Sequence, residues 1–381
     1  MHILIIPSWY PNINSSLSGI FFKEQAEAIA NQNLKVGCIA INESALRYIL
    51  SSEVKSFAYT DELMNNVQTM SLVYPSINRL KRLRAIIRKQ IFKILFKNYI
   101  RVHGRPDIVH LHSFFYGDLA LWIKKKYNIN YVVTEHSTAF ARGLLSRREL
   151  DFANEVFKNS SHNIAVSSEF RHLLKRQLNI NFDFIPNMVN TDFFSLKANK
   201  SNSNFVFVNI AFLGKKKNQS MLIEAFYKAF SDNKKVKLII VGDGEEYDRL
   251  NVLIKNLNLQ PQVTLYGRAN RNEIKDLLQS SNAFVLSSKV ETFGVVIIEA
   301  MSCGLPVVST KSGGPESIIT NNKLGELVEN SSDSLAKGMF TIFNSTYNKE
   351  YIRAYTIRNF SKEAICDKLI QIYKVHEKVK D

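Results

Sequence analysis

The chain has 381 residues, of which 45% are hydrophobic and 22% charged. This length and apolar content exclude an intrinsically disordered chain and favour two domains with cores of ordinary size. The 50 Lys and Arg against 34 Asp and Glu give a formal net charge of +16, which favours anionic partners such as nucleotide phosphates, anionic lipids or nucleic acid. Three widely separated cysteines fit neither a disulfide framework nor a zinc site, and so indicate a reducing, cytoplasmic compartment.

Short β-branched runs alternate with helical patterns along the chain. Strands are predicted at 3–6, 35–41, 108–112, 131–134 and 163–166, and again at 205–213, 237–241, 263–266, 283–286 and 306–309. Helical periodicity occupies 21–31, 219–230, 245–256 and 273–279. This alternation is typical of parallel sheets with crossover helices.

A polar, turn-rich stretch at 185–204 interrupts the alternation, which then begins afresh. We therefore expect two α/β domains. No stretch approaches the roughly 18 apolar residues of a membrane span, so we expect a protein that is soluble or attached to a membrane surface.

The most informative segment is 285–316. A predicted strand is followed by Glu291, by Gly294 at a helix start, and by Glu299 within that helix. The free N–H groups of a helix start can bind a diphosphate, and a carboxylate can accept hydrogen bonds from the two hydroxyls of a ribose. The alternative is two exposed glutamates with glycines that only form turns, but the ordered run that continues to Gly313 and Gly314 argues against it.

These motifs resemble the hallmark of retaining GT-B glycosyltransferases of the glycosyl transferase group 1, family 4 type. The resemblance covers nearly the whole chain. It implies two Rossmann-like domains facing each other across a cleft: an acceptor-side domain at 1–190 and a nucleotide-sugar-binding domain at 191–359. It also implies that a C-terminal helix at about 360–381 packs back on the first domain.

The same resemblance assigns roles to the donor-binding residues. Glu299 would hold the ribose, Glu291 would face the hydroxyls of the donor sugar, and the backbone of Thr292, Phe293, Gly294 and Val295 would bind the diphosphate.

Lys217 matches the phosphate-binding Lys of the family. The family's Arg is absent, and Lys215 is a candidate substitute without the bidentate fork of Arg. A solvated turn is the alternative for this lysine run. Gly242, Gly267 and Arg268 match strand ends on the nucleotide side. The third glycine of a dinucleotide fingerprint is missing after Gly242, which disfavours NAD.

In the first half, Gly19 stands before the first helix, whose start would point at the donor phosphate. Read alone, it is a loop glycine. His110 and His112 share one face of a strand, and His136 follows the end of the next strand. Since His112 is nearer the loop, the resemblance places His112 and His136 near the sugar and acceptor, although a strand-end histidine is more often structural.

Segment 79–101 is strongly basic, and no acidic residue occurs between Glu62 and Asp107. Apolar residues recur in it at helical spacing, at positions 80, 83, 87, 91 and 94. A basic amphipathic helix is typical of a membrane-surface element, and the alternative is a helix packed on the core with a solvated basic face.

The resulting prediction is a hexosyltransferase that acts in polysaccharide biosynthesis, with Glu291, His112 and Lys217 as catalytic residues. It would use a nucleotide-diphosphate sugar, either UDP- or GDP-linked, and a lipid-linked glycan acceptor, at the inner face of the cell membrane. No bound metal or cofactor is expected. Alternatives are a sugar-nucleotide epimerase of the same architecture and a non-catalytic polyanion binder, although no nucleic-acid-binding motif is present.

Overall fold

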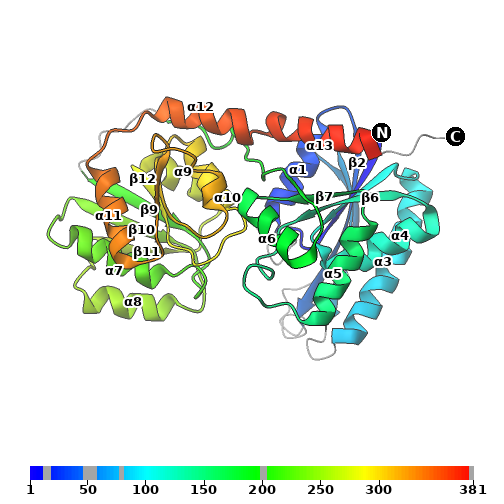
Figure 1. Cartoon of the computed structure of the whole chain (residues 1–381), viewed down its shortest axis with the longest axis horizontal. Coiled ribbons are helices and arrows are strands. Elements are labelled where there is room, and N and C mark those ends of the chain that lie inside the picture. The colour runs from blue at the N-terminus through cyan, green and yellow to red at the C-terminus, as the bar shows by residue number, and fades with distance from the viewer. Residues whose placement is uncertain (12–18, 46–57, 77–80, 198–203, 377–381) are drawn as a thin grey trace. The chain divides into compact units, whose positions relative to one another are not determined.

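The computed structural model describes residues 1–11, 19–45, 58–76, 81–197 and 204–376 and divides into two compact units (Figure 1). Unit 1 comprises Met1–Val166, Arg171–Ile185 and Ile365–Asp381, and unit 2 comprises Ser167–Phe170 and Pro186–Ala364. The main boundary therefore lies at Ile185 rather than at the expected position 190, and the returning segment begins at Ile365. Positions 79–80 and 377–381, which belong to predicted helices, lie outside the described residues.

The sheet of unit 1 has the strand order β3-β4-β2-β1-β5-β6-β7-β8. Its strands are β1 (His2–Pro7), β2 (Lys35–Ala45), β3 (Ala58–Met64), β4 (Val67–Ser76), β5 (Ile108–His112), β6 (Asn130–Glu135), β7 (His162–Ala165) and β8 (Asp183–Phe184). All pairs are parallel except β3 with β4. The strand order reverses between β1 and β5, and the loops that leave the carboxyl ends of parallel strands at such a point form the usual ligand site.

The β3–β4 hairpin is a feature that the sequence analysis missed. Its turn, Asn65–Asn66, has two positive φ angles, 48° and 66°. This is the twist that a tight two-residue hairpin needs, and an asparagine pair between alternating segments is a recognisable signal for it. The hairpin extends the parallel sheet by one antiparallel edge strand.

Helices cover both faces of the unit 1 sheet. They are α1 (Ile20–Ala30), α3 (Lys81–His103), α4 (Gly117–Tyr127), α5 (Arg147–Asn159), α6 (Ser168–Leu178) and α13 (Lys362–His376), with the short η1 (Phe114–Tyr116). The C-terminal helix α13 is held by side chains: the Tyr373 hydroxyl lies 2.6 Å from His110 Nδ1, and Asn130 Nδ2 donates to the His376 carbonyl at 3.1 Å.

Unit 2 contains a six-stranded parallel sheet in the order β11-β10-β9-β12-β13-β14. Its strands are β9 (Phe205–Ile210), β10 (Val236–Val241), β11 (Val263–Gly267), β12 (Ala283–Leu286), β13 (Val307–Thr310) and β14 (Gly325–Val328). The order reverses between β9 and β12, so the loops after these two strands converge. The predicted doubly layered α/β class is confirmed in both units.

The main core of unit 2 lies between one face of this sheet and α7 (Gln219–Phe230), α8 (Tyr247–Asn256) and α11 (Ser332–Phe343). The helices α9 (Arg271–Ser280) and α10 (Val295–Ser302) cover the other face (Figure 1). The short η2 (Pro315–Ser317) follows β13, and α12 (Lys349–Phe360) leads into α13. The predicted helices at 219–230, 245–256 and 273–279 are confirmed to within two residues at either end.

Candidate functional site

The loops after β9 and β12 of unit 2 bring two of the predicted catalytic residues into contact. The loop after β9 carries Lys217 and the loop after β12 carries Glu291, and their side chains form a short ion pair. Two further hydrogen bonds tie the loops together: Lys289 N donates to Lys216 O at 2.9 Å, and Ser287 Oγ donates to Lys217 O at 2.8 Å. The pair is therefore held by the backbone on both sides.

The Glu291 carboxylate is kept ionised although it is buried. Burial acts to raise the pKa of Glu291, but Lys217 outweighs it and holds this pKa below its ordinary value. Ser288 Oγ also donates to Glu291 Oε1 at 2.6 Å. A buried carboxylate fixed in this way can accept hydrogen bonds from sugar hydroxyls, and the ammonium beside it supplies positive charge to an anion.

The helix α10 begins directly after this pair. Its N-cap is Gly294, and no side chain caps its first N–H groups. The predicted diphosphate-binding residues Thr292, Phe293, Gly294 and Val295 form this turn, so unsatisfied donors and the positive helix end coincide with the position expected for phosphate.

The loop after β13 packs directly on this turn. A Cβ atom added to Gly314 would lie 2.4 Å from the backbone N, Cα and O of Phe293, so no larger residue fits at 314 without movement. Glu291 N also donates to Ser312 O at 2.8 Å. The diphosphate turn is therefore fixed between two neighbouring loops.

Glu299 lies on α10 and is 6% exposed. Arg271, at the start of α9, reaches it: Arg271 Nη1 lies 3.0 Å from Glu299 Oε1. The guanidinium also lies 4.9 Å from the centre of the Phe194 ring, a cation–π distance. Arg271 is a residue that the sequence analysis missed, because it is 28 positions from its partner and belongs to no motif quoted for the family.

The remaining predicted donor residues lie further along the same edge of the unit 2 sheet. Gly242 N donates to Gly267 O at 2.8 Å, which joins the ends of β10 and β11. Arg268 Nε lies 2.9 Å from Asp243 Oδ2 on an exposed surface. Lys215 is exposed, and it lines a separate small cavity of about 150 Å³ beside α7 and α8. Lys217 and Glu291 are thus in contact, whereas Lys215 is not in that cluster.

In unit 1, Gly19 is the N-cap of α1 with φ of 68°. A Cβ atom there would lie 2.4 Å from the carbonyl oxygen of Trp9, so both the backbone conformation and the space require glycine. The loop between them is only partly described, since residues 12–18 lie outside the described part of the chain.

His112 and His136 are brought together as expected. His112 Nδ1 lies 3.1 Å from His136 Nε2, and the rings of Phe21 and Phe22 from α1 pack against them. His112 is fully buried. Burial and the neighbouring imidazoles hold the pKa of His112 well below its usual range, and burial lowers the pKa of His136 to about 3. Both rings are therefore neutral near neutral pH and can serve as hydrogen-bonding groups.

His110 has a structural environment. Its Nε2 lies 2.8 Å from Thr134 Oγ1, and its Nδ1 contacts Tyr373 of α13. Glu135, next to His136, accepts hydrogen bonds from Ser113 Oγ and from three backbone N–H groups, which fixes the β6 end. The choice of His112 over His110 as the ligand-facing histidine agrees with these contacts, because the ring nitrogens of His110 are both satisfied by the protein.

The predicted basic helix is α3, but its two faces differ from the expectation. Arg84 forms an ion pair with Glu43, and Arg88 Nη2 lies 3.2 Å from Asp118 Oδ1. These charges are therefore neutralised by unit 1 itself. The side chain of Arg82 lies outside the described residues.

Apolar side chains of α3 lie on two sides. Phe92, Leu95, Phe96 and Tyr99 form its buried side. Leu83, Ile86, Ile87 and Ile94 are between 41% and 68% exposed. The apolar positions at 83, 87 and 94 thus do not pack on the core. No helix among the described residues is long and apolar enough to cross a membrane, and no group of three or more metal-ligating side chains is found in that part of the chain.

Comparison with known protein families identifies the class. Residues 190–371 match the family described as glycosyl transferases group 1, and residues 22–193 match glycosyltransferase family 4. The two matches adjoin and together account for 22–371. The chain belongs to this glycosyltransferase family and is a transferase enzyme.

Particular relatives are more distant. An uncharacterized glycosyltransferase of Methanocaldococcus jannaschii is 27% identical over 82% of this chain and 86% of its own length. One polypeptide of the human phosphatidylinositol N-acetylglucosaminyltransferase is 26% identical over 87% of this chain and 66% of its own. The N-acetyl-alpha-D-glucosaminyl L-malate synthase of Bacillus anthracis is 33% identical, but over 34% of this chain and a third of its own length.

Solved structures agree with the fold. The sucrose-phosphate synthase of Thermosynechococcus elongatus superposes with a TM-score of 0.80 at 19% identity, over 98% of this chain and 99% of that one. The Anabaena protein HepE, solved in complex with UDP, gives a TM-score of 0.74 at 20% identity, over 98% and 100% of the two chains. The architecture is GT-B, as predicted.

Proposed function

We propose that this glycosyltransferase transfers a hexosyl group, with retention of anomeric configuration, from a nucleotide-diphosphate sugar to a hydroxyl of a lipid-linked glycan. The observation that carries the proposal is the braced cluster of Lys217 and Glu291 directly before the uncapped start of α10, with Glu299 one turn further along that helix. Its spacing suits a diphosphate at the helix start, a sugar at Glu291 and a ribose at Glu299.

The proposed chemistry follows from the charges of this cluster. When the glycosidic bond to the diphosphate breaks, negative charge develops on the leaving oxygen, and the Lys217 ammonium together with the α10 N–H groups would stabilise it. We assign no protein nucleophile. The acceptor hydroxyl would attack from the face of the departing phosphate, which takes its proton, and the configuration at the anomeric carbon is retained. Glu291 would hold the donor hydroxyls during this step.

His112 and His136 are proposed as hydrogen-bonding groups for the transferred sugar or acceptor. Their lowered pKa values argue for neutral imidazoles that orient a hydroxyl rather than for a permanent cation. Because Lys217 and the helix start supply the positive charge, we propose that the reaction needs no bound metal. Turnover that persists in excess EDTA is the expected result, and loss of turnover restored by a divalent cation would contradict it.

The donor is proposed to be a UDP- or GDP-sugar. HepE was solved with UDP, and the human relative is named as an N-acetylglucosaminyltransferase, which supports this class of donor. The test is calorimetric titration with UDP and, separately, GDP, for the wild type and Glu299→Ala. Binding of one nucleotide that Glu299→Ala abolishes is expected, and binding of neither to folded protein would contradict the donor site.

Two alternatives are separated by product analysis. A sugar-nucleotide epimerase of this architecture would convert the donor without any acceptor, whereas the proposed enzyme would consume it only when an acceptor hydroxyl is present. A polyanion binder would bind duplex nucleic acid with steep salt dependence, unaffected by Glu299→Ala. NMR of the anomeric proton of the product tests retention directly.

We also propose peripheral attachment of unit 1 to an anionic membrane surface at the cytoplasmic side. Its support is the exposed apolar row of α3, Leu83, Ile86, Ile87 and Ile94, followed on the same helix by exposed Lys97 and Arg101. Such a face suits insertion of apolar side chains at the level of lipid headgroups. Binding to anionic vesicles should be weakened by Ile86→Ser with Ile94→Ser, and unchanged binding would contradict the proposal.

A further inference from the structure

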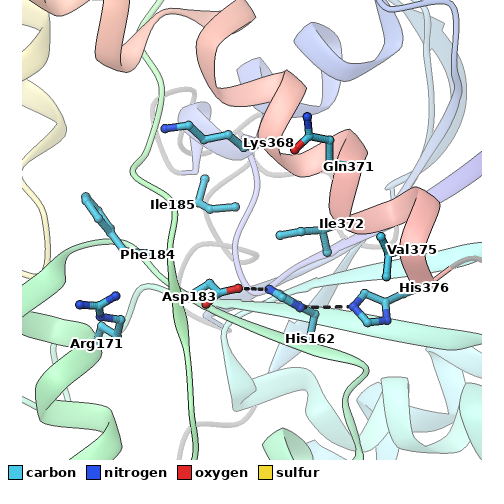
Figure 2. Close-up of a pocket in the computed structure, with 10 residues that line it drawn as sticks. All are labelled: His162, Arg171, Asp183, Phe184, Ile185, Lys368, Gln371, Ile372, Val375 and His376. Atoms are coloured by element: carbon cyan, nitrogen blue, oxygen red, sulfur yellow. Dashed lines mark hydrogen bonds and ion pairs between the residues drawn. The ribbon is translucent and has the colours of Figure 1, made fainter.

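A cavity in unit 1 is unrelated to the residues discussed so far. It has a volume of about 520 Å³ and is bounded by β7, β8, α6 and α13 (Figure 2). Cavities of 300 to about 1,000 Å³ are of the size that binds small molecules. All of the lining residues belong to unit 1.

This cavity is remote from the histidine pair within the same sheet. It lies along β8, the edge strand, which is three strands from β5 and His112; at about 4.8 Å per strand this is roughly 14 Å. Its floor includes His162 and Asp183, which begin β7 and β8, whereas His112 and His136 lie at the carboxyl ends of β5 and β6. It is therefore not part of the candidate catalytic edge.

One end of the cavity is a fixed row of polar side chains. His162 Nε2 lies 2.9 Å from Asp183 Oδ2, and His376 Nε2 lies 3.3 Å from His162 Nδ1 (Figure 2). The row joins the starts of two strands to the end of α13. Because Asp183 already faces His162, the one carboxylate among the lining residues has a partner.

The other end carries cations. In Figure 2 the charged ends of Arg171 and Lys368 and the ring of Phe184 lie on the side away from the two histidines. Among the described residues, neither cation forms an ion pair with a carboxylate; the polar contact of Arg171 is to His172 at 3.3 Å. The cavity thus has two cations without carboxylate partners against one carboxylate that is already paired.

The wall between these ends is apolar. It is formed by Phe184 and Ile185 from the β8 side and by Ile372 and Val375 from α13. The surface beside it is also basic, since His172, Lys175 and Arg176 of α6 line an adjoining hollow. Positive potential of this kind raises the local concentration of anions. The chemistry that fits is an anion with an apolar group attached.

We propose that this cavity is a second ligand site, which binds a small phosphomonoester through Arg171 and Lys368 and packs its apolar part on Phe184, Ile185 and Ile372. A phosphate offers several acceptor oxygens to the guanidinium and the ammonium. The ligand would bridge α6 and β8 to α13, so its binding would strengthen the attachment of the C-terminal helix to unit 1.

The test is a titration with phenyl phosphate and with inorganic phosphate, followed by calorimetry in the presence of saturating UDP. UDP occupies the proposed donor site, so the remaining heat reports a different site. The wild type should bind phenyl phosphate at one site and inorganic phosphate more weakly. Arg171→Gln with Lys368→Gln should raise the Kd at least about tenfold.

The matched control is Arg176→Gln with Lys374→Gln, which removes one exposed Arg and one exposed Lys from the same two helices. Its Kd should stay within about twofold of the wild type. Equal losses in both double variants, no binding by the wild type at millimolar concentrations, or binding that UDP abolishes would each overturn the proposal. Ile372→Ser should remove the preference for phenyl phosphate over inorganic phosphate.

Two sources of this chemistry are separated by a vesicle arm. Flotation with phosphatidic acid vesicles that is lost in the Arg171→Gln, Lys368→Gln variant would assign the phosphate to a lipid headgroup, and unchanged flotation would assign it to a soluble metabolite. The test is independent of the donor proposal: phenyl phosphate binding retained in Glu299→Ala, where UDP binding is lost, would uphold this site alone.

Discussion

Replacing Lys217 by Met tests whether the ion pair with Glu291 organises the donor site. The change keeps the length of the side chain and removes its charge, which leaves the Glu291 carboxylate, whose side chain is 8% exposed, without its cation. Removing one partner of a fully buried pair costs about 3–5 kcal/mol of unfolding free energy. Because the Lys217 side chain is 19% exposed and Ser288 still donates to the carboxylate, we expect about 2–3 kcal/mol here.

The pH dependence gives the sign of the effect. In the wild type the folded-state pKa of Glu291 lies below 4.5, so its contribution to stability is present above this pH and is lost as the pH falls through the lower folded value. In Lys217→Met burial alone acts on the carboxyl and raises its pKa, so the penalty appears as the pH rises above about 4.5. The difference between the two proteins should therefore be larger near neutral pH than near pH 4.

Chemical denaturation followed by two signals measures this. Both tryptophans, Trp9 and Trp122, lie in unit 1, so their fluorescence follows that unit, whereas far-UV circular dichroism follows the helices of both. We expect the circular dichroism transition to shift more than the fluorescence transition. The double variant with Glu291→Gln should recover most of the loss, since no unpaired charge remains.

The reasoning is refuted if Lys217→Met costs less than about 0.5 kcal/mol near neutral pH, or if its cost is the same near pH 4. A double variant no more stable than the single one would also contradict it, because the coupling between contacting charges should be about 1–2 kcal/mol. In either case the pair would be a surface contact without a role in fixing the loops.

Three further predictions concern the other residues of the site, and a fourth concerns α3. Arg271→Gln should weaken UDP binding about tenfold, because Glu299 loses the cation that orients it, and calorimetry measures the change; an unchanged Kd would show that Glu299 is positioned by α10 alone. Gly314→Ala should lower both UDP affinity and thermal stability, by about 1–3 kcal/mol for the latter, since the added methyl group displaces the Phe293 backbone. His112→Asn should reduce kcat and leave the Kd for UDP unchanged. Ile94→Ser alone should weaken vesicle flotation about tenfold, as expected from the loss of one 68% exposed isoleucine, while leaving kcat on a soluble acceptor intact.

The sequence predicted those contacts that follow from strand order. Lys217 and Glu291 are 74 positions apart, yet each follows a strand of a parallel sheet at its reversal point, so their meeting could be expected from motif and topology together. The strands themselves were predicted to within a few residues, because parallel strands buried on both faces read as continuous apolar runs.

Contacts that no local rule encodes were not predicted. Arg271 reaches Glu299 from a different helix, and His376 meets His162 across 214 positions of the chain, so neither pair leaves a pattern within either segment. In α3 the periodicity was right but its meaning was not: apolar residues occur on both sides of the helix, and only the packing separates buried Phe96 from exposed Ile94. The paired state of Arg84 likewise depends on Glu43 from a distant strand.

The location of the proposed donor residues has a consequence for mechanism. Lys217, Glu291, Glu299 and Arg271 all belong to unit 2, and their hydrogen bonds and ion pairs described above are made within that unit. Nucleotide affinity should then be a property of unit 2, and variants there should change the Kd for UDP. The histidine pair belongs to unit 1, so His112 variants should change kcat without changing that Kd. A His112 variant that lost UDP affinity would mean that the nucleotide site draws on both units, and the division of labour proposed here would be wrong.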